Sequence, residues 1–590
     1  MSDFQPPLRA MRLLMDELGE LPAIAGLPGF EEATPELADA VLEEAARFAG
    51  DILAPLNAVG DRVGCRWRPE GVATPPGWDE AYRHFCAGGW NGISADPAYG
   101  GQGLPCVLSV AVRELFASAN LAFSIGPLLT AGAIEALRHC ASDSLRQRYL
   151  PKMIDGSWSG TMNLTEPQAG SDLAQLRTRA EPQADGRFRI FGQKIFISYG
   201  EHELTENIIH LVLARLPDAP PGVRGISLFV VPKFLPDANG QPGERNDVVC
   251  SAIEHKLGIH GSPTCVMVYG ENGGAIGELV GEANRGLEYM FVMMNEARHG
   301  VGVQGVALGE RALQLATAYA AERRQGRDAV SGEALVSIDH HPDVQRMLRG
   351  MQMRVEATRA LAYYTAGLLD RAHAEPEEAA RQAALYMAEL LMPLVKAGGT
   401  EMAVEVTSTG IQVHGGMGFI EETGAARLWR DARITPIYEG TTGIQANDLI
   451  FRKLLRDKGA TAERLFADIA ATRAELAADA GLAALGEQLQ AALAHWQAAT
   501  AWVLARIKTA PGPVLFAAVP YLELSGLVTG GWLLGRLALA SRRLQAAGCT
   551  DTDLCTTRRT LARLYGDTCL SRTGGLAATV MAGDSALTAD

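Results

Sequence analysis

Two kinds of hydrophobic periodicity alternate along this chain, and their order constrains its fold more than any other feature. Apolar residues recur at helical spacing in the first 150 residues, for example in Glu36–Ala49, Val107–Ser118 and Leu128–His139. The pattern changes from about Trp158, with a period of two from Arg187 onward, and the helical period returns from Gly286 in segments tens of residues long. The order predicts a helical region, a small β domain and a helical bundle.

The middle of the chain contains four short segments typical of strands, separated by turns of Gly, Pro and Asp. They are Arg187–Ile197, Ile208–Leu216, Gly225–Val231 and Val266–Tyr269. No helix long enough for a parallel crossover lies between them, so we expect an antiparallel sheet or barrel.

The second helical block consists of long segments with short connections, which is typical of a bundle. Its segments are Gly286–Glu322, Val344–Leu369 and Glu377–Thr409, with Asn447–Arg456 closing the block. Residues beyond Ala460 form a separate helical unit rich in Ala and Leu. The predicted domains are residues 1–157 (helical), 158–285 (β), 286–458 (bundle) and 459–590 (extra helical domain).

Composition excludes several classes of protein. A net charge of -15 argues against a nucleic-acid binder, which usually carries a basic face. Nine cysteines form no CxxC pair or His/Cys cluster, so we expect no metal site and reduced thiols in the cytoplasm. The charged N-terminus is not typical of a signal peptide. Glu523 interrupts the apolar stretch Pro513–Leu534, which favours a buried helix over a transmembrane segment, with membrane-surface contact as the alternative.

Three segments contain the glycines and polar groups of ligand-binding loops. Met162–Asp172 (MNLTEPQAGSD) is either such a loop or an interdomain turn capped by Asp172. Gln412–Phe419 (QVHGGMGF) contains three glycines within four positions, and its His414 is more often a structural histidine than an acid or base. A literal GxGxxG at Gly300–Gly305 lies inside an expected helix, so it indicates close helix packing instead of a dinucleotide site.

The third segment, Tyr438–Gln445 (YEGTTGIQ), places Glu439 after an apolar run and before a glycine. Desolvation raises the pKa of a carboxyl group in such a setting, which suits a base working near neutral pH. A helix-capping Glu is the alternative, and the residues alone leave the two interpretations equally balanced.

Together these segments resemble the acyl-CoA dehydrogenase family. TEPQAGSD matches the family signature TEPxAGSD, GQKIFIS resembles NGxKxWIT, and KLGIHGSPT resembles KxGxRGSxT. Arg430–Asp431 leading to YEGT resembles the RDAxxxxIYEGT block. The resemblance covers roughly residues 80–455. It implies a mainly α protein with a helical N-terminal domain, a β-barrel middle domain and a four-helix bundle, followed here by an extra C-terminal helical domain.

The resemblance also implies a role for individual positions. Glu439 is the expected catalytic base, because Ala297 stands where some members carry theirs and Glu296 points about 100° away on a helix. The expected FAD-binding residues are Met162, Leu164, Thr165, Ser171, Phe196, Ser198, Arg323, Gln412, Val413, His414, Gly415, Gly416, Thr441 and Gly443. The expected substrate-binding residues are Ser171, Asn295, Arg298, Tyr438 and Gly440.

Three departures from the family pattern stand out. Gly443 occupies a position where many members have Gln, and Phe196 and Ser198 replace the usual Trp and Thr. The connection Arg323–Gln345 is longer than the common form. The extra C-terminal unit and the N-terminal PPLRAMRLLMDELGE resemble a bacterial subgroup that includes 3-methylmercaptopropionyl-CoA dehydrogenases and general fatty acyl-CoA dehydrogenases.

The implied reaction is the α,β-dehydrogenation of an acyl-CoA thioester to a trans-2-enoyl-CoA. Glu439 removes the α proton, FAD takes the β hydride, and an electron-transfer flavoprotein receives the electrons. Gln412–Gly416 would contact the FAD of a neighbouring subunit, which implies a homodimer or homotetramer. An acyl-CoA oxidase, a DNA-associated relative and an FAD-binding assembly protein are the alternatives.

Overall fold

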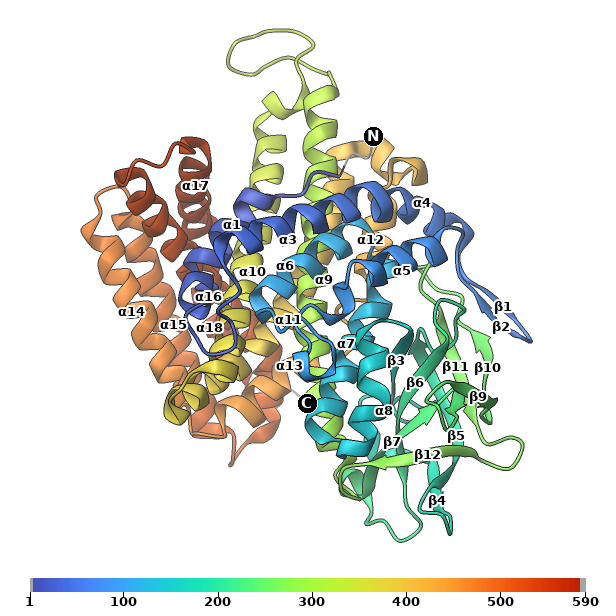
Figure 1. Cartoon of the computed structure of the whole chain (residues 1–590). Coiled ribbons are helices and arrows are strands. Elements are labelled where there is room, and N and C mark those ends of the chain that lie inside the picture. The colour runs from blue at the N-terminus through green and yellow to red at the C-terminus, as the bar shows by residue number, and fades with distance from the viewer. Residues whose placement is uncertain (1–3, 584–590) are drawn as a thin grey trace, which may run out of the picture.

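The computed structural model describes residues 4–583, so the ends of the predicted first and last domains, residues 1–3 and 584–590, lie outside it. Its elements form four regions in chain order (Figure 1). The first region is helical apart from a hairpin of β1 (Arg66–Arg68) and β2 (Gly71–Ala73). Its helices are α1 (Leu8–Glu17), α2 (Leu21–Ile24), α3 (Pro35–Phe48), α4 (Ala54–Val63), α5 (Trp78–Ala87), α6 (Cys106–Ala119), α7 (Leu121–Cys140) and α8 (Asp143–Ile154).

The second region is an eight-stranded sheet with an added two-stranded ribbon. The sheet contains β3 (Trp158–Asn163), β4 (Arg179–Pro182), β5 (Phe188–Ser198), β6 (Asn207–Arg215), β7 (Ile226–Pro232), β10 (Val248–Ile253), β11 (Thr264–Tyr269) and β12 (Ala275–Val280). The ribbon pairs β8 (Phe234–Pro236) with β9 (Pro242–Arg245). Pairing runs β5–β12–β7–β6, and β4 joins β6 back to β5, so these five strands close into a small barrel.

The sheet is not wholly antiparallel, which corrects the sequence-based expectation. β3 pairs with β6 in parallel, from Trp158 opposite Asn207 to Asn163 opposite Val212. The chain passes through β4 and β5 between these two strands, and that excursion supplies the crossover that a parallel pair needs. β3 is buried at nearly every position, so its sequence lacks the period of two by which strands were identified.

The third region is a bundle of long helices, as predicted. It contains α9 (Gly286–Glu322), α10 (Pro342–Ala374), α11 (Glu378–His414), α12 (Ala425–Ala432) and α13 (Thr442–Asp448), followed by the π-helical turn η9 (Leu449–Leu454). The last element therefore begins before the expected Asn447, because the Thr441 side chain caps α13 by accepting the Ile444 N–H. The connection between α9 and α10 extends away from the rest of the chain as a hairpin (Figure 1).

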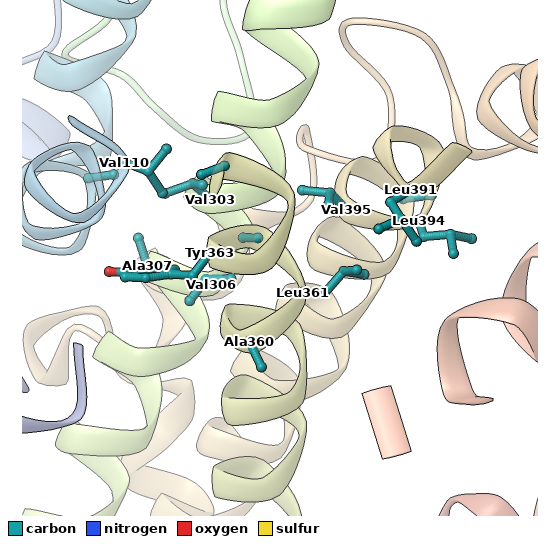
Figure 2. Packing of buried hydrophobic residues seen from close by; sticks show 14 of the residues in the cluster. Val110, Val303, Val306, Ala307, Ala360, Leu361, Tyr363, Leu391, Leu394 and Val395 are labelled. Atoms are coloured by element: carbon teal, nitrogen blue, oxygen red, sulfur yellow. The ribbon is translucent and has the colours of Figure 1, made fainter. Parts of the chain in front are cut away.

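Glycines allow α9 and α11 to touch through their backbones. A Cβ atom at Gly305 would lie 2.2 Å from the Gly399 carbonyl oxygen, and one at Gly399 would lie 2.5 Å from that of Gly302. This confirms the packing interpretation of the GxGxxG stretch. Around the contact, buried apolar side chains from α6, α9, α10 and α11 interdigitate, among them Val303 and Val395 (Figure 2).

The fourth region is a helical unit packed against the bundle on the side away from the β domain (Figure 1). Its helices are α14 (Ala460–Ala478), α15 (Ala483–Arg506), α16 (Pro511–Ala546), α17 (Thr552–Thr568) and α18 (Thr573–Met581). By length and composition, α7 and α16 are each long and apolar enough to cross a membrane. However, 67% of the most apolar 18-residue stretch of α7 and 61% of that of α16 are buried inside the fold. The expected buried helix at Pro513–Leu534 lies within α16.

A buried charge network joins three of the four regions. Arg359 on α10 contacts Glu114 on α6 at 2.8 Å and Glu310 on α9 at 2.7 Å. Arg558 on α17 lies 2.6 Å from Glu356, which also belongs to α10. Because an unpaired buried charge is costly, these ions constrain how the helical regions dock.

Adjacent glycines of α11 test the backbone contact. Gly399→Ala should lower the free energy of unfolding by about 1–3 kcal/mol, because its methyl group would overlap the Gly302 carbonyl. Gly398→Ala is the matched control, since its added Cβ would meet no other part of the described structure within 4 Å, and it should raise stability by up to about 1 kcal/mol. Chemical denaturation of both variants measures the difference, and equal effects would contradict the close contact.

Candidate active site

A cavity of about 950 Å³ opens where the β domain meets the bundle. Its walls come from the loop after β3, the end of β5, the loop before β11, the first half of α9 and the segment between α12 and α13. These elements are far apart in sequence, so only folding brings them together. The predicted site residues that line the cavity are Met162, Leu164, Thr165, Ser171, Phe196, Ser198, Arg298, Tyr438, Glu439, Gly440 and Thr441.

The loop after β3 is anchored by a buried ion pair. The Glu166 carboxylate lies 2.9 Å from Lys194 Nζ on β5 and also accepts hydrogen bonds from the Arg177 and Thr178 N–H groups. Although burial opposes ionisation, Lys194 and the Thr178 hydroxyl hold the pKa of Glu166 at about 2. Lys194 also donates to the Leu164 carbonyl at 3.0 Å. The Glu of the TEPQAGSD segment therefore fixes the loop instead of contacting a ligand.

The end of β5 turns an aromatic ring into the cavity. Phe196 has a φ of 61°, in the left-handed region that L-residues rarely adopt. The register between β5 and β11 shifts beside it, which marks a β-bulge, and bulges re-aim side chains. Phe196 is accordingly 59% exposed at the cavity wall.

The Glu439 backbone is held in an equally uncommon conformation. Its φ is 56°, and that of Gly440 is 91°. Lys396 Nζ, from α11, donates to the carbonyl oxygens of Thr435 at 2.9 Å and Gly440 at 2.8 Å. Gln445 Nε2 donates to the Glu439 carbonyl at 3.0 Å. These buried donors over-determine the turn, which is how strained backbone persists at functional sites.

The Glu439 carboxyl group is partly buried and has titration properties suited to a base. Burial raises its pKa to about 7, although Arg298 and Lys396 act in the opposite direction. Within residues 4–583, neither its carboxylate nor its backbone N–H makes a hydrogen bond. Both groups are therefore free to act on a ligand.

Arg298 is the other charged group at the base of the cavity. Its guanidinium lies 3.2 Å from the Asp448 carboxylate and packs over the Phe291 ring at 5.6 Å. Burial lowers its pKa, while Asp448 and Glu439 counteract that effect. Its Nε atom is buried and has no hydrogen-bond partner among the residues that the structure describes, so it remains available to a ligand.

Several predicted residues do not line the cavity. Asn295 lies one position from Met294 on α9 and so faces another direction. Arg323 directly follows the last residue of α9, 25 residues beyond Arg298, which places it about 38 Å away at 1.5 Å per residue. The others outside the cavity are Gln412, Val413, His414, Gly415, Gly416 and Gly443.

The residues Gln412–Gly416 span the end of α11 at His414, which lies beside the end of α9. His414 is buried, its Nδ1 lies 2.7 Å from the Gly410 carbonyl, and its ring stacks on Tyr319 of α9. This agrees with a structural histidine. Next to it Phe419 is 84% exposed, and Met417 and Ile420 are also exposed apolar residues.

Sequence reasoning missed several residues of the cavity and its support. Lys256, Leu257 and Ile259 line it, and the resemblance of their segment to KxGxRGSxT was the available signal. The cations Arg433 and Arg452 also line it. No sequence signal marked these two or Lys396, whose role depends on the loop that reaches it.

The competing acid Glu296 lies outside the cavity. Its carboxylate pairs with Arg113 of α6, and Ala297 beside it is buried. Glu296 is therefore held away from the cavity wall, whereas Glu439 lines the cavity and interacts electrostatically with both Arg298 and Lys396.

Four family models together match most of the chain between residues 35 and 589. They are the acyl-CoA dehydrogenase N-terminal domain (residues 35–157), middle domain (161–271) and C-terminal domain (284–454), and the acetyl-CoA dehydrogenase C-terminal-like domain (465–589).

Relatives and solved structures agree with these matches. A 3-methylmercaptopropionyl-CoA dehydrogenase of Ruegeria pomeroyi is 50% identical over 92% of both chains. A butyryl-CoA dehydrogenase of Syntrophomonas wolfei is 36% identical over 86% of this chain and 85% of its own. An acyl-CoA dehydrogenase complexed with FAD from Bacillus anthracis shares the fold, with a TM-score of 0.75 and 21% identity over 93% of this chain and 88% of that one.

Removing the Lys396 charge should shift the pH dependence of activity. Because Lys396 lowers the pKa of Glu439, Lys396→Met should raise it, and the base would then ionise at higher pH. In the wild type, kcat/KM for an acyl-CoA should rise with pH to a midpoint of about 7. The variant's midpoint should lie above that value.

Lys453→Met provides the matched control, since Lys453 pairs with Glu389 in the same bundle and does not act on Glu439. A Lys396→Met profile that overlays the wild type would contradict this coupling.

Proposed function

Because this chain belongs to the acyl-CoA dehydrogenase family, we propose that it oxidises a short acyl-CoA, with 3-(methylthio)propanoyl-CoA as the favoured substrate. It is an FAD-dependent oxidoreductase that converts an acyl-CoA to an enoyl-CoA. The observation that carries the assignment of the base is the unpartnered Glu439 carboxyl group at the cavity wall, with its pKa raised to about 7.

The cavity fits FAD in its chemistry. Large apolar side chains stand uncovered on its wall, notably Phe196 at 59% and Leu257 at 54% exposure, and a flat aromatic ring system would cover them. Thr165 and Ser198 supply hydroxyl groups beside them. When bound, FAD supplies the hydride acceptor for the substrate β carbon. A volume of about 950 Å³ also leaves room for the thioester end of the substrate.

The chain's own residues account for the removal of the proton. The free Glu439 N–H donates to the thioester carbonyl oxygen and stabilises negative charge as it develops there. The Glu439 carboxylate then takes the α proton, and the left-handed turn orients the N–H of the same residue. Apolar side chains such as Phe291, Met294 and Ile434 exclude water from this end of the cavity.

Basic residues at the cavity support binding of phosphate groups. Lys256, Arg433 and Arg452 line it, although the whole chain carries a net charge of -15. Such a local concentration of positive charge attracts the phosphates of coenzyme A and of FAD. The arginines of the extra C-terminal unit have a different role, because Arg542 and Arg543 pair with Asp479 and Glu17. This disfavours a nucleic-acid surface there.

The preference for a thioether substrate rests on similarity. The relative at 50% identity is a 3-methylmercaptopropionyl-CoA dehydrogenase, and the chains cover 92% of each other. The butyryl-CoA dehydrogenase at 36% identity also acts on a short acyl group. A fatty acyl-CoA of greater length is the alternative.

Homo-oligomerisation, the electron acceptor and the compartment are further parts of the proposal. Arg323 and Gln412–Gly416 do not line their own chain's cavity, and exposed Phe419 lies beside them, which supports contact with the FAD of a second copy. The resemblance favours an electron-transfer flavoprotein as acceptor. All nine cysteines are free thiols, which supports a reducing compartment such as the cytoplasm.

Glu439→Gln tests the assignment of the base. The amide cannot take the proton, so acyl-CoA should reduce the bound flavin at least about a hundredfold more slowly, with FAD content unchanged. Stopped-flow absorbance of the flavin measures the rate. Glu296→Gln is the control, because its carboxylate pairs with Arg113 outside the cavity. Normal flavin reduction by Glu439→Gln would rule out this base.

A pair of substrates of equal length tests the thioether preference. 3-(Methylthio)propanoyl-CoA and pentanoyl-CoA have the same number of chain atoms and differ in one sulfur. We expect kcat/KM for the thioether to equal or exceed that for pentanoyl-CoA. If pentanoyl-CoA is oxidised and the thioether is not, the proposed substrate is wrong. Hydrogen peroxide formed in step with the product would indicate an oxidase.

A further inference from the structure

A second, smaller hollow adjoins Gln304, the residue to which the Tyr438 hydroxyl is hydrogen-bonded. It measures about 50 Å³ and is walled mainly by apolar side chains of α5, α6, α7 and α9, including Phe116, Phe123, Leu128 and Val303. Gln304 of α9 also lines it. The Tyr438 hydroxyl donates a hydrogen bond to the Gln304 side-chain oxygen, and Tyr438 is itself one of the residues that line the large cavity. This pair of side chains therefore stands between the two spaces.

The pair is costly to separate. Gln304 is only 3% exposed, so its side-chain oxygen has no solvent to replace the hydroxyl. Opening the contact would leave a buried donor and a buried acceptor unsatisfied, at about 1–3 kcal/mol for each group. A methylene chain, which forms no hydrogen bonds, offers nothing in exchange.

The Tyr438 side chain also has little freedom to move aside. Its own N–H donates to the Ile434 carbonyl at 3.2 Å. The next residue, Glu439, is fixed in the left-handed region by the donors from Lys396 and Gln445. A shift of the Tyr438 backbone would disturb the turn that orients Glu439.

We propose that the Tyr438–Gln304 pair closes the inner end of the acyl pocket and restricts the enzyme to short acyl chains. This inference rests on the proposed function, since it requires that the acyl group enters the cavity beside Glu439. The substrate α carbon then lies beside Glu439, which directly follows Tyr438 in the chain. Only a few further atoms of the acyl chain therefore fit into the pocket before they reach the Tyr438–Gln304 pair. The apolar hollow behind it is an extension that a longer chain enters only when the pair is broken.

Gln304→Ala tests the closure. The wild type should favour butyryl-CoA over octanoyl-CoA in kcat/KM by tenfold or more. The variant removes the amide and joins the hollow to the cavity, so the octanoyl-to-butyryl ratio should rise by about tenfold or more, given the favourable burial of each added methylene group. Both substrates are measured with the FAD-loaded enzyme and an artificial electron acceptor.

Two further variants make the test specific. Tyr438→Phe keeps the ring and removes only the hydroxyl, so it should raise the octanoyl-to-butyryl ratio by a smaller factor. This variant tests the closure on its own if Gln304→Ala does not fold. Val303→Ala enlarges the hollow without touching the pair, so its ratio should match the wild type.

The outcomes separate this inference from the proposed function. A wild type that oxidises octanoyl-CoA as efficiently as butyryl-CoA overturns the closure and leaves the proposed dehydrogenase activity standing. An unchanged ratio in Gln304→Ala and Tyr438→Phe also overturns it. If no acyl-CoA reduces the flavin, both the proposed function and the closure are wrong.

Discussion

The backbone contact between α9 and α11 is the constraint on which the site depends. Gly302, Gly305 and Gly399 let the two helices approach until an added Cβ would meet a carbonyl oxygen. Arg298 lies on one of these helices and Lys396 on the other. The distance between the two helices therefore sets how closely the two cations approach Glu439. Burial raises the pKa of the Glu439 carboxyl group and the cations lower it, so this distance also sets the balance between the two effects.

Uncommon backbone conformations concentrate at the cavity. Phe196, Ile259 and Glu439 all have positive φ, and they come from the end of β5, the loop before β11 and the segment before α13. Buried hydrogen-bond donors stabilise the turn at Glu439, and a β-bulge accompanies the positive φ of Phe196. Strained residues at one cavity from three separate elements indicate that stability was traded for the orientation of side chains there.

The large-scale arrangement supports this local precision. Arg359 joins α6, α9 and α10 through buried carboxylates, and Arg558 adds the extra C-terminal unit to the same network. A buried ion lowers the stability of the fold unless its oppositely charged partners lie close to it. The network therefore favours one docking arrangement of the helical regions. The bundle helices that form the floor of the cavity are thereby fixed from both sides.

Much of this protein follows from the sequence by itself. Periodicity determined the order of helical and β regions and the limits of α9, because alternation and helical spacing are local properties. The motifs marked Glu439, Phe196 and Thr165, which line one cavity. Only the tertiary structure decided that β3 pairs with β6 in parallel and that Lys396 supports the Glu439 turn. It also decided that the ion pair with Arg113 keeps Glu296 out of the cavity and that Arg323 lies outside it. Those features are contacts between residues far apart in the chain, and no local pattern specifies which distant partner a side chain will meet.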